Sequence, residues 1–341
     1  MSDGEIVPLS SAVPAVPEPV DEDALTPEAA ARVADGWAAN TRRAIDYDWG
    51  RFTAWCAATG RRPLPATGAT LTNYVTHLMQ ARPAPATIER ALGIVQTYHK
   101  AVDLAVNAKP ARLALRSYRR EWGTTEGNRV RRAAAVDVDQ LTAMLRAAPD
   151  GLVGLRDRTV VLLGYTMMAR RSELARLDIG DVRLVTEGLE VFIASSKTDK
   201  DAVGAVARIP YGTLALTCAV RTTAAWAGAL AEHGLTAGPL LRGIDRHGRL
   251  AGTPGATLRG TGRMSGAGIN LIVQRLAAAA ELEGVTAHSL RAGSATAAAM
   301  AGVPRAQIAR HGRWEPTSTA VDTYIRPAEG WEHNPMRRVG L

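Results

Sequence analysis

The sequence predicts a mainly α-helical protein of about two domains, the second of which carries a small antiparallel sheet. Three observations support this fold class. Alanine is abundant while aromatic residues make up only 5%, which favours helices packed through small side chains. Apolar residues recur at helical spacing along most of the 341 residues, and only two neighbouring segments alternate as strands do.

The positive charge of the chain is unevenly distributed. The formal net charge is +8, yet the first 31 residues hold seven acidic residues and no lysine or arginine. Most of the basic residues are arginine, which pairs with phosphate oxygens better than lysine does. The basic body suggests a polyanionic partner, most simply nucleic acid, although a soluble basic protein without such a partner would have the same charge.

The cysteine content and the hydropathy of the chain disfavour several classes of protein. The two cysteines, Cys56 and Cys218, are far apart in apolar helical contexts, so we expect neither a disulfide framework nor a zinc site. The N-terminus lacks the pattern of a signal peptide, and no apolar run approaches ~18 residues. We therefore expect a cytoplasmic protein with no membrane segment and no bound metal.

The first part of the chain is predicted to be an acidic tail followed by a helical domain. Residues 1–26 combine acidic residues with four prolines and little apolar periodicity, which is typical of disorder. In the helical domain, 27–122, one predicted helix places Trp49, Phe52 and Cys56 on a single face. The predicted helices are at 26–40, 41–60, 70–81, 84–105 and 110–122.

A basic linker is predicted at 123–136. Glycine, threonine and asparagine break the helical periodicity at 123–128, and Arg129, Arg131 and Arg132 follow as a basic run. A solvated loop is the simpler explanation of such a run, but a basic linker between two basic domains also suits a protein that surrounds DNA.

The second domain is predicted at 137–328, with a C-terminal tail at 329–341. Its predicted strands, 189–196 and 202–210, pair across the segment KTDKD as an antiparallel hairpin. A glycine-rich loop is expected over 238–268. The predicted helices are at 137–149, 155–177, 213–234, 268–282 and 286–302. No βαβ rhythm, phosphate-binding glycine loop or metal-ligand spacing is present in the sequence, which leaves the chemistry to side chains.

The segment TAHSLRAGSATAAAMAG, 286–302, presents two cation-capable side chains in its first turn. His288 and Arg291 are three residues apart and share a helix face, at the end of the helix that favours an anion. The alanine-rich remainder allows the helix to pack closely. A capped helix with a solvated arginine is the alternative.

Further polar residues follow a recognisable order along the second domain. Arg170 and Glu173 lie in MMARRSELARL, Lys197 in KTDKD, His288 and Arg291 in HSLRAG, Trp314 in HGRW and Tyr324 in DTYIRP. In this order they resemble the tyrosine recombinase (phage integrase) family, in the two-domain organisation of its Cre-like members. The resemblance covers roughly 27–341.

The resemblance implies a role for each residue. Tyr324 would attack a DNA phosphodiester and form a 3′-phosphotyrosine. Arg170 and Arg291 would bind the non-bridging oxygens of the transition state. His288 and Trp314 would add hydrogen bonds, His288 also assisting proton transfer. Lys197 would protonate the departing 5′ oxygen, and Glu173 would orient Arg170 or His288.

Alternatives exist for most of these assignments. Arg171 competes with Arg170, Lys200 with Lys197 and His311 with Trp314. Trp314 could serve only in packing, and a hairpin lysine is often simply solvated. The spacing from Trp314 to Tyr324 is one residue longer than the family pattern leads us to expect. Of the other tyrosines, four lie in helical patterns that predict core positions (Tyr47, Tyr74, Tyr98, Tyr165), and Tyr118 and Tyr211 lack neighbouring signals.

The resemblance also implies a substrate and an assembly. A helical core-binding domain and a mixed α/β catalytic domain would form a C-shaped clamp on double-stranded DNA with inverted-repeat sites. The protein would be a monomer when free and a homotetramer on DNA, passing through a Holliday junction without metal, ATP or other cofactor. It would be nucleoid-associated if bacterial, and the C-terminal tail could dock on a neighbouring protomer. Candidate DNA-binding residues are Arg42, Arg43, Arg90, Lys100, Arg129, Arg131 and Arg132.

Two other functions fit the same residues. A type IB topoisomerase-like enzyme would use them as a monomer to relax supercoiled DNA. A DNA-binding regulator would carry them as a vestigial site. Relaxation without synapsis would indicate the former, and DNA binding without a covalent adduct the latter.

Overall fold

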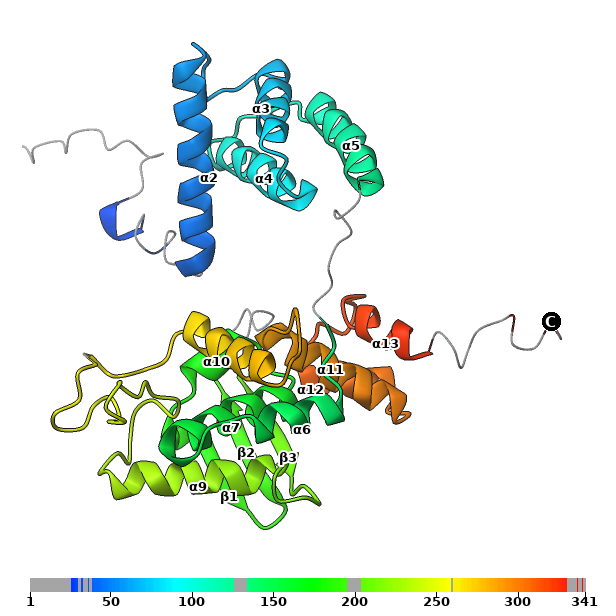
Figure 1. The fold of residues 1–341 in the computed structure, drawn as a ribbon. Helices are drawn as coiled ribbons and strands as arrows, with labels where there is room; N and C mark the ends of the chain where they lie inside the picture. Colours follow the sequence, from blue (N-terminus) through cyan, green and yellow to red (C-terminus); the bar gives the residue numbers. More distant parts are fainter. Residues whose placement is uncertain are drawn as a thin grey trace, which may run out of the picture. The chain divides into compact units, whose positions relative to one another are not determined.

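The chain divides into two compact units, residues 1–130 and 131–341, and each is described by itself. The computed structural model describes residues 26–29, 32, 36, 39–125, 134–194, 204–258, 260–329, 336 and 339 (Figure 1). Most of the predicted acidic tail, much of the predicted linker and most of the C-terminal tail therefore lie outside the described residues. Every helix within them is too short or too polar to cross a membrane.

The first unit is helical. Its described helices are α2 (Ala39–Ala58), α3 (Gly68–Gln80), α4 (Pro85–Ala101) and α5 (Lys109–Thr124). The Thr67 hydroxyl caps α3 by accepting a hydrogen bond from the Thr70 amide at 3.1 Å. Prolines in the first turn begin α4 and α5, where no amide donor is needed.

Aromatic side chains form much of the core of this unit. Phe52 is fully buried, its ring lies 4.9 Å from that of Tyr74, and Trp49 stacks on Tyr98 at 3.9 Å. Tyr47 was predicted to be a core residue, and this is wrong, because 61% of its surface is exposed. It lies five positions from Phe52, or about 500° around the helix, and so faces away from the buried side of α2.

The second unit is mixed, which confirms the predicted fold class of a mainly α protein with a small antiparallel sheet. The described elements are α6 (Val138–Arg146), α7 (Gly151–Thr166), α8 (Arg171–Arg176), η1 (Ile179–Asp181), β1 (Val182–Val185), β2 (Gly188–Ile193), β3 (Ala205–Pro210), α9 (Ala219–Glu232), α10 (Gly266–Ala279), α11 (Ala287–Met300), α12 (Arg305–Gly312) and α13 (Asp322–Glu329).

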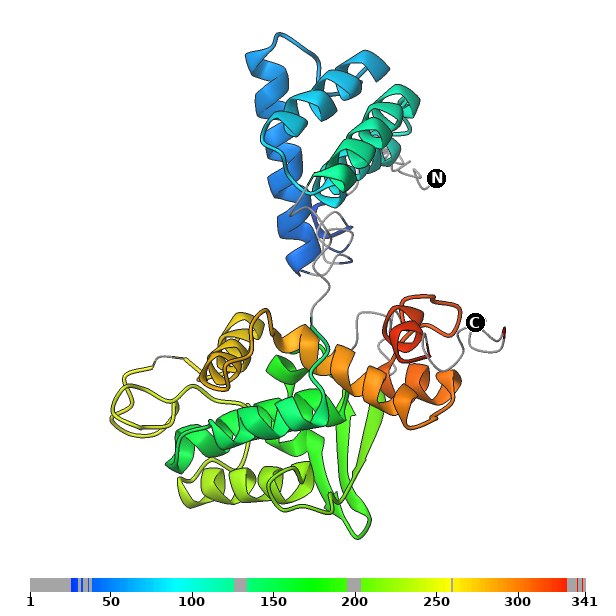
Figure 2. The same cartoon turned by 45° about the vertical axis from the view of Figure 1, so that its right-hand side comes forward.

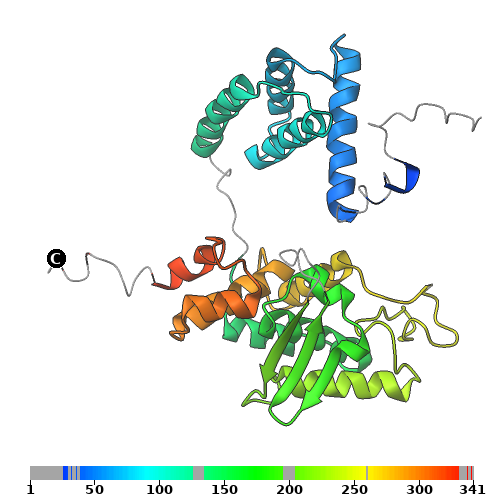
Figure 3. The same cartoon turned by 180° about the vertical axis from the view of Figure 1, so that it is seen from behind.

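The sheet has the order β1-β2-β3, and both pairs are antiparallel (Figure 3). Val191 of β2 lies opposite Val182 on one side and Ala207 on the other. Alternate side chains of β2, those of Leu189, Val191 and Ile193, are buried in the core. The pairing of β2 with β3 agrees with the predicted hairpin, whereas β1 was not predicted.

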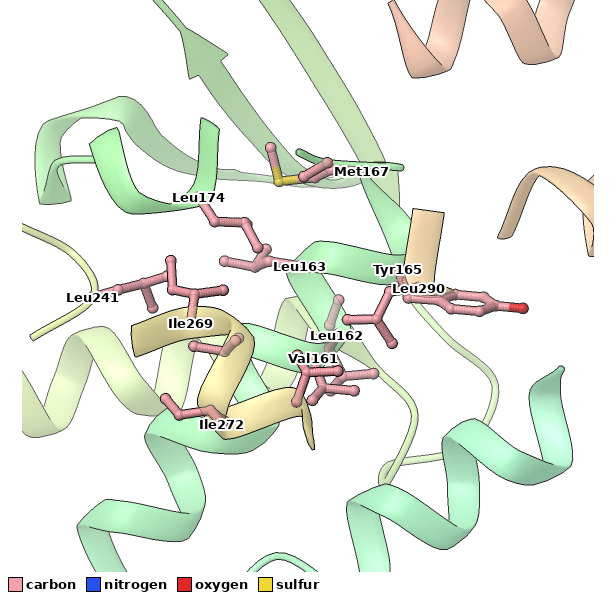
Figure 4. Packing of buried hydrophobic residues seen from close by; sticks show 14 of the residues in the cluster. Val161, Leu162, Leu163, Tyr165, Met167, Leu174, Leu241, Ile269, Ile272 and Leu290 are labelled. Atoms are coloured by element: carbon pink, nitrogen blue, oxygen red, sulfur yellow. The ribbon is translucent and has the colours of Figure 1, made fainter. Parts of the chain in front are cut away.

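Helix α7 lies at the centre of the second unit and is buried on most sides. It contacts α9, α10 and α11, and Figure 4 shows Leu162 and Leu163 among side chains from its neighbours. From Val160 to Leu163 the helix is apolar and buried on all sides, which is typical of a core position. Gly164 permits close contact with α11, since a Cβ there would lie 2.9 Å from Leu290 Cδ1.

The single helix predicted at 155–177 is wrong, because the chain leaves the helix after Thr166 and begins α8 at Arg171. Met168 has a left-handed conformation, with φ 48°. Its amide donates to the Tyr165 carbonyl and the Ala169 amide to the Gly164 carbonyl, both at 3.0 Å, which is the Schellman pattern of a helix end. That position usually carries glycine or asparagine. Because methionine occupies it here, the sequence gives no signal that the helix ends.

Candidate active site

The first turn of α11 is held tightly against the rest of the second unit. The Ser289 hydroxyl accepts a hydrogen bond from the Thr286 amide at 3.0 Å, and the Ser289 carbonyl accepts one from the Val136 amide at 3.3 Å. One turn later, Gly293 leaves no room for a side chain, because a Cβ there would lie 1.9 Å from the Val136 carbonyl oxygen. These contacts fix the directions of His288 and Arg291.

Three helices bring the C-terminal candidates together. Figures 1 and 2 show α12 and α13 beside α11. The Tyr324 hydroxyl on α13 lies 2.7 Å from His288 Nε2 on α11, and the Trp314 and Tyr324 ring centroids are 5.8 Å apart. The three side chains therefore form one cluster, although Tyr324 follows His288 by 36 residues.

The loop between Trp314 and Tyr324 is tied down at its base. Arg305, at the start of α12, donates from Nε to Asp322 Oδ1 at 2.5 Å and from Nη2 to the Ser318 carbonyl at 2.8 Å. The extra residue in this loop, noted from the sequence, thus leaves Tyr324 within hydrogen-bonding distance of His288.

Arg291 is buried at the centre of this cluster, with only 2% of its surface exposed. Its Nη1 donates to the Met168 carbonyl, and its guanidinium carbon lies 3.7 Å from the Trp314 ring centroid. Within the described part of the chain, its Nη2 has no hydrogen-bond partner. A buried guanidinium with an unused donor is costly unless a ligand supplies the acceptor.

Trp314 makes packing contacts with both apolar and charged neighbours. It belongs to a small buried cluster with Ile308, Val321 and Ile325, and its ring forms a cation–π contact with Arg291. Gly312 makes room for that ring, since a Cβ there would lie 1.8 Å from Trp314 Cζ3.

Arg170 lies where α8 begins and is paired with Glu173. The Arg170 Nη1 donates to Glu173 Oε1 at 2.7 Å, and its backbone amide donates to Oε2 at 3.0 Å. About a fifth of the Arg170 side chain remains exposed, whereas Glu173 is buried. The sequence left open whether Glu173 orients Arg170 or His288, and the Glu173 carboxylate is hydrogen-bonded to Arg170.

Arg313 is a site residue that the sequence analysis missed. Its Nη2 donates to Glu173 Oε2 at 2.8 Å and to the Met167 carbonyl at 3.0 Å. The neighbouring His311, considered as an alternative to Trp314, is hydrogen-bonded through Nε2 to the Thr166 carbonyl at 2.7 Å. The only available signal was the arginine of HGRW, which stands 140 residues from Glu173.

Backbone carbonyls at the end of α7 hold three of these side chains in place. Thr166, Met167 and Met168 follow one another, and their carbonyls accept from His311, Arg313 and Arg291. The C-terminal end of a helix carries partial negative charge, which stabilises cations. Because α7 ends at Thr166, these carbonyls have no partner within the helix and can accept from side chains.

Burial and charge set the pKa values in the site. Burial, then the charge of Arg170, lowers the pKa of Arg291 to about 9, so its guanidinium is still charged at neutral pH. Burial alone would raise the pKa of Glu173, but Arg313 and the hydrogen bonds from Arg170 more than offset it and hold that pKa below its ordinary value. Arg170 and Arg313 therefore share one carboxylate, and with Arg291 nearby the site has a cationic excess.

The pKa values of the His288–Tyr324 pair favour a neutral pair. Burial, followed by the charges of Arg291 and Arg170, lowers the pKa of His288. Burial raises the pKa of the Tyr324 hydroxyl, although the same two arginines oppose this. A neutral imidazole at hydrogen-bonding distance from a protonated tyrosine can accept the tyrosine proton.

Other predicted site residues fall outside this cluster. Lys197 and Lys200 lie in 195–203, and Arg129, Arg131 and Arg132 lie in 126–133, all outside the described residues. In the first unit, Arg90 is half exposed and donates to the buried Asp48 at 2.8 Å. Arg43 and Lys100 are exposed and Arg42 is partly buried. No group of three or more potential metal ligands occurs among the residues the structure describes.

The chain is similar to several site-specific recombinases. No protein-family model matches it. An integrase/recombinase XerD homolog of Selenomonas ruminantium is 30% identical over 326 residues, covering 94% of this chain and 91% of that protein. The Cre recombinase of Escherichia phage P1 is 24% identical over 171 residues, 48% of this chain and 49% of Cre.

Two solved structures share the fold. An integrase of the Tn1549 transposon, in complex with transposon right-end DNA, aligns with a TM-score of 0.59 and 13% identity over 91% of this chain and 96% of that one. Lambda integrase bound to DNA aligns with a TM-score of 0.53 and 12% identity over 88% of this chain and 93% of that one.

Proposed function

The chain belongs to the tyrosine recombinase family, and from this premise we propose that it is a site-specific DNA recombinase with Tyr324 as its nucleophile. The observation that carries the assignment is the hydrogen bond between Tyr324 and His288 beside Arg291, a buried guanidinium with an unused donor. A DNA phosphate is the ligand that would satisfy that donor and meet the tyrosine hydroxyl.

In the proposed reaction the Tyr324 oxygen attacks the phosphorus of a DNA phosphodiester. A bond forms between that oxygen and phosphorus, and the bond from phosphorus to the 5′ oxygen breaks, which leaves a 3′-phosphotyrosine and a free 5′-hydroxyl. The tyrosine proton passes to His288, and we propose Lys197 as the proton donor to the departing oxygen. Arg170, Arg291 and the Trp314 indole N–H would stabilise the charge on the non-bridging oxygens.

The covalent intermediate explains how strands can be rejoined. The phosphotyrosine ester keeps the energy of the broken bond, so a 5′-hydroxyl from another strand can attack it without ATP. Reversal of the first step then releases Tyr324 and returns its proton. The two guanidiniums supply the charge stabilisation for which other phosphoryl-transfer enzymes use a metal ion.

The stoichiometry of strand exchange supports the proposed assembly. One chain carries one nucleophile and cleaves one strand, so exchange between two duplexes requires four chains. We therefore propose a monomer that assembles as a homotetramer on two inverted-repeat sites and passes through a Holliday junction. Arg42, Arg43, Arg90, Lys100 and the arginines at 129, 131 and 132 are proposed to contact DNA, and action on DNA implies a cytoplasmic location.

Removal of the nucleophile tests the proposal. The assay uses a nicked suicide substrate in a buffer that contains EDTA. Tyr324→Phe should abolish the denaturation-resistant adduct, because phenylalanine has no oxygen to attack phosphorus. It should still bind the same DNA in a gel-shift assay. Tyr211→Phe is the matched control, since Tyr211 is an exposed tyrosine outside the cluster, and it should form the adduct normally. An adduct that persists in Tyr324→Phe would show that another residue is the nucleophile.

Removal of the C-terminal tail tests the proposed assembly. Docking of 331–341 on a neighbouring protomer would join the chains in a closed ring. Deletion of 331–341 should leave binding to one-site DNA unchanged and weaken cooperative binding to two-site DNA. Gel-shift titrations of the two substrates measure both quantities, and equal cooperativity with and without the tail would contradict the docking.

A further inference from the structure

Arg313 has a backbone conformation that its residue type disfavours. It follows α12 directly, with φ 57° and ψ 46°. A side chain in the left-handed region is strained, and glycine would occupy the position without that strain. Strain of this kind persists where the side chain is needed, so its contacts indicate what it does.

The side chain of Arg313 joins two parts of the active site that are far apart in sequence. It is 8% exposed, donates to the His311 carbonyl at 2.9 Å, and reaches Met167 and Glu173 across the second unit. In return, the Arg313 carbonyl accepts from Arg170 Nη2 at 3.4 Å. Arg313 directly precedes Trp314 in the sequence and is hydrogen-bonded to Glu173 and Arg170. It therefore links the segment that carries Trp314 to the segment that carries Arg170.

The charges explain why a second arginine is needed at Glu173. A buried carboxylate must be fully paired, and Arg170 alone would form a neutral pair with it. With Arg313 also bound, the group of two guanidiniums and one carboxylate keeps a positive charge. Oε2 binds Arg313 and the Arg170 amide, while Oε1 binds the Arg170 guanidinium, so each oxygen is held in place.

From these contacts we infer that Arg313 is a positioning residue for Arg170, acting through Glu173, an inference that rests on the proposed function. Arg313 neutralises Glu173, so that the charge of Arg170 is available to the phosphate. It also fixes the rotation of the carboxylate, and with it the direction of the Arg170 guanidinium. Arg313 itself makes no contact with the reacting atoms in this role.

The test begins with Arg313→Gly, which removes the side chain and suits the left-handed backbone. The single-turnover cleavage rate on saturating suicide substrate should fall about 10- to 100-fold, as expected for a misplaced catalytic group. DNA affinity should change little. Arg310→Ala is the matched control, because Arg310 is an exposed arginine three residues earlier, and its cleavage rate should stay within about twofold of the original.

A double-mutant cycle separates positioning from a purely structural role. In a Glu173→Gln background there is no carboxylate charge to neutralise, so adding Arg313→Gly should slow cleavage by less than about twofold. An equal loss in both backgrounds would overturn the inference. Arg313→Lys keeps the charge without the three-way contact and should recover part of the rate.

A measurement on the free protein distinguishes failure of this inference from failure of the proposed function. The Nε–H resonance of Arg170, assigned with Arg170→Lys, should shift or broaden in Arg313→Gly and stay unchanged in Arg310→Ala. An unchanged Arg170 resonance in Arg313→Gly would overturn the inference. If the original protein forms no covalent adduct with DNA, the proposed function fails, while the resonance still decides whether Arg313 positions Arg170.

Discussion

Two buried arginines in the second unit, Arg242 and Arg291, differ in how fully the protein satisfies their hydrogen-bond donors. Arg242 lies in the glycine-rich loop between α9 and α10 and is 5% exposed. Each of its guanidinium nitrogens donates to a carbonyl, with the acceptors on Ala237, Pro239, Ala251 and Thr261. Arg291 has one carbonyl acceptor, one aromatic face and one nitrogen without a partner among the described residues.

The difference shows that burial alone does not distinguish a structural arginine from a ligand-binding one. Burial lowers the pKa of both. What separates them is whether the protein satisfies the donors itself. Arg242 stabilises a loop with little regular structure. Arg291 keeps a donor without a partner among the described residues, and the proposed function assigns that donor to a phosphate.

The largest effect that this comparison predicts is on catalysis. Arg291→Ala should reduce the cleavage rate by at least ~10²-fold, because the transition state loses a charged hydrogen-bond donor. Its melting temperature should fall less than that of Arg242→Met, because one carbonyl loses its donor here and four lose theirs there. A suicide-substrate assay and a thermal melt measure the two quantities. A near-normal cleavage rate would contradict the assignment of Arg291.

The next effect is on stability. Arg242→Met keeps most of the side-chain volume and leaves four carbonyls without their donor, so the free energy of unfolding should fall by about 2 kcal/mol. Cleavage per folded molecule should be unchanged at temperatures well below the melting transition. Urea unfolding monitored by circular dichroism gives the loss, and a cleavage defect without a stability defect would remove the distinction between the two arginines.

The smallest effect is on the titration of His288. Burial, and then Arg291 and Arg170, lower the pKa of His288 from 6.5, so loss of the Arg291 charge should raise that pKa toward its ordinary value. The imidazole should then become protonated at a higher pH and accept the Tyr324 proton less readily there. Carbon-detected NMR titration should show a higher pKa of His288 in Arg291→Ala and an unchanged pKa of His288 in Arg242→Met. The same titration in both variants would mean that Arg291 does not face His288.

The sequence predicts the side chains of the site better than the backbone groups that hold those side chains in place. Arg170, His288, Arg291, Trp314 and Tyr324 lie in short motifs with recognisable spacing, and the structure brings them together. The backbone carbonyls of Thr166, Met167 and Met168 leave no such trace, because any residue supplies a carbonyl. The assigned roles, including that of Lys197, stay predictions.

The missed parts of the fold have equally physical reasons. The helix break at Met168 lacks the glycine that usually marks one, and the apolar pattern continues through it. The strand β1 is only four residues long and none of its side chains is buried, so its sequence shows little alternation of apolar and polar residues. Arg313 could not be linked to Glu173 without the fold, since sequence spacing says nothing about contacts 140 residues apart.

The use of main-chain acceptors at the end of α7 restricts how this region can diverge among descendants of the gene. Substitutions between Thr166 and Arg170 that keep the packing of Met167 and Met168 leave all three carbonyls where they are. An insertion or deletion of one residue would instead shift the acceptors of His311, Arg313 and Arg291 together. Drift in amino-acid identity is therefore tolerable at this turn, while a change in its length is not.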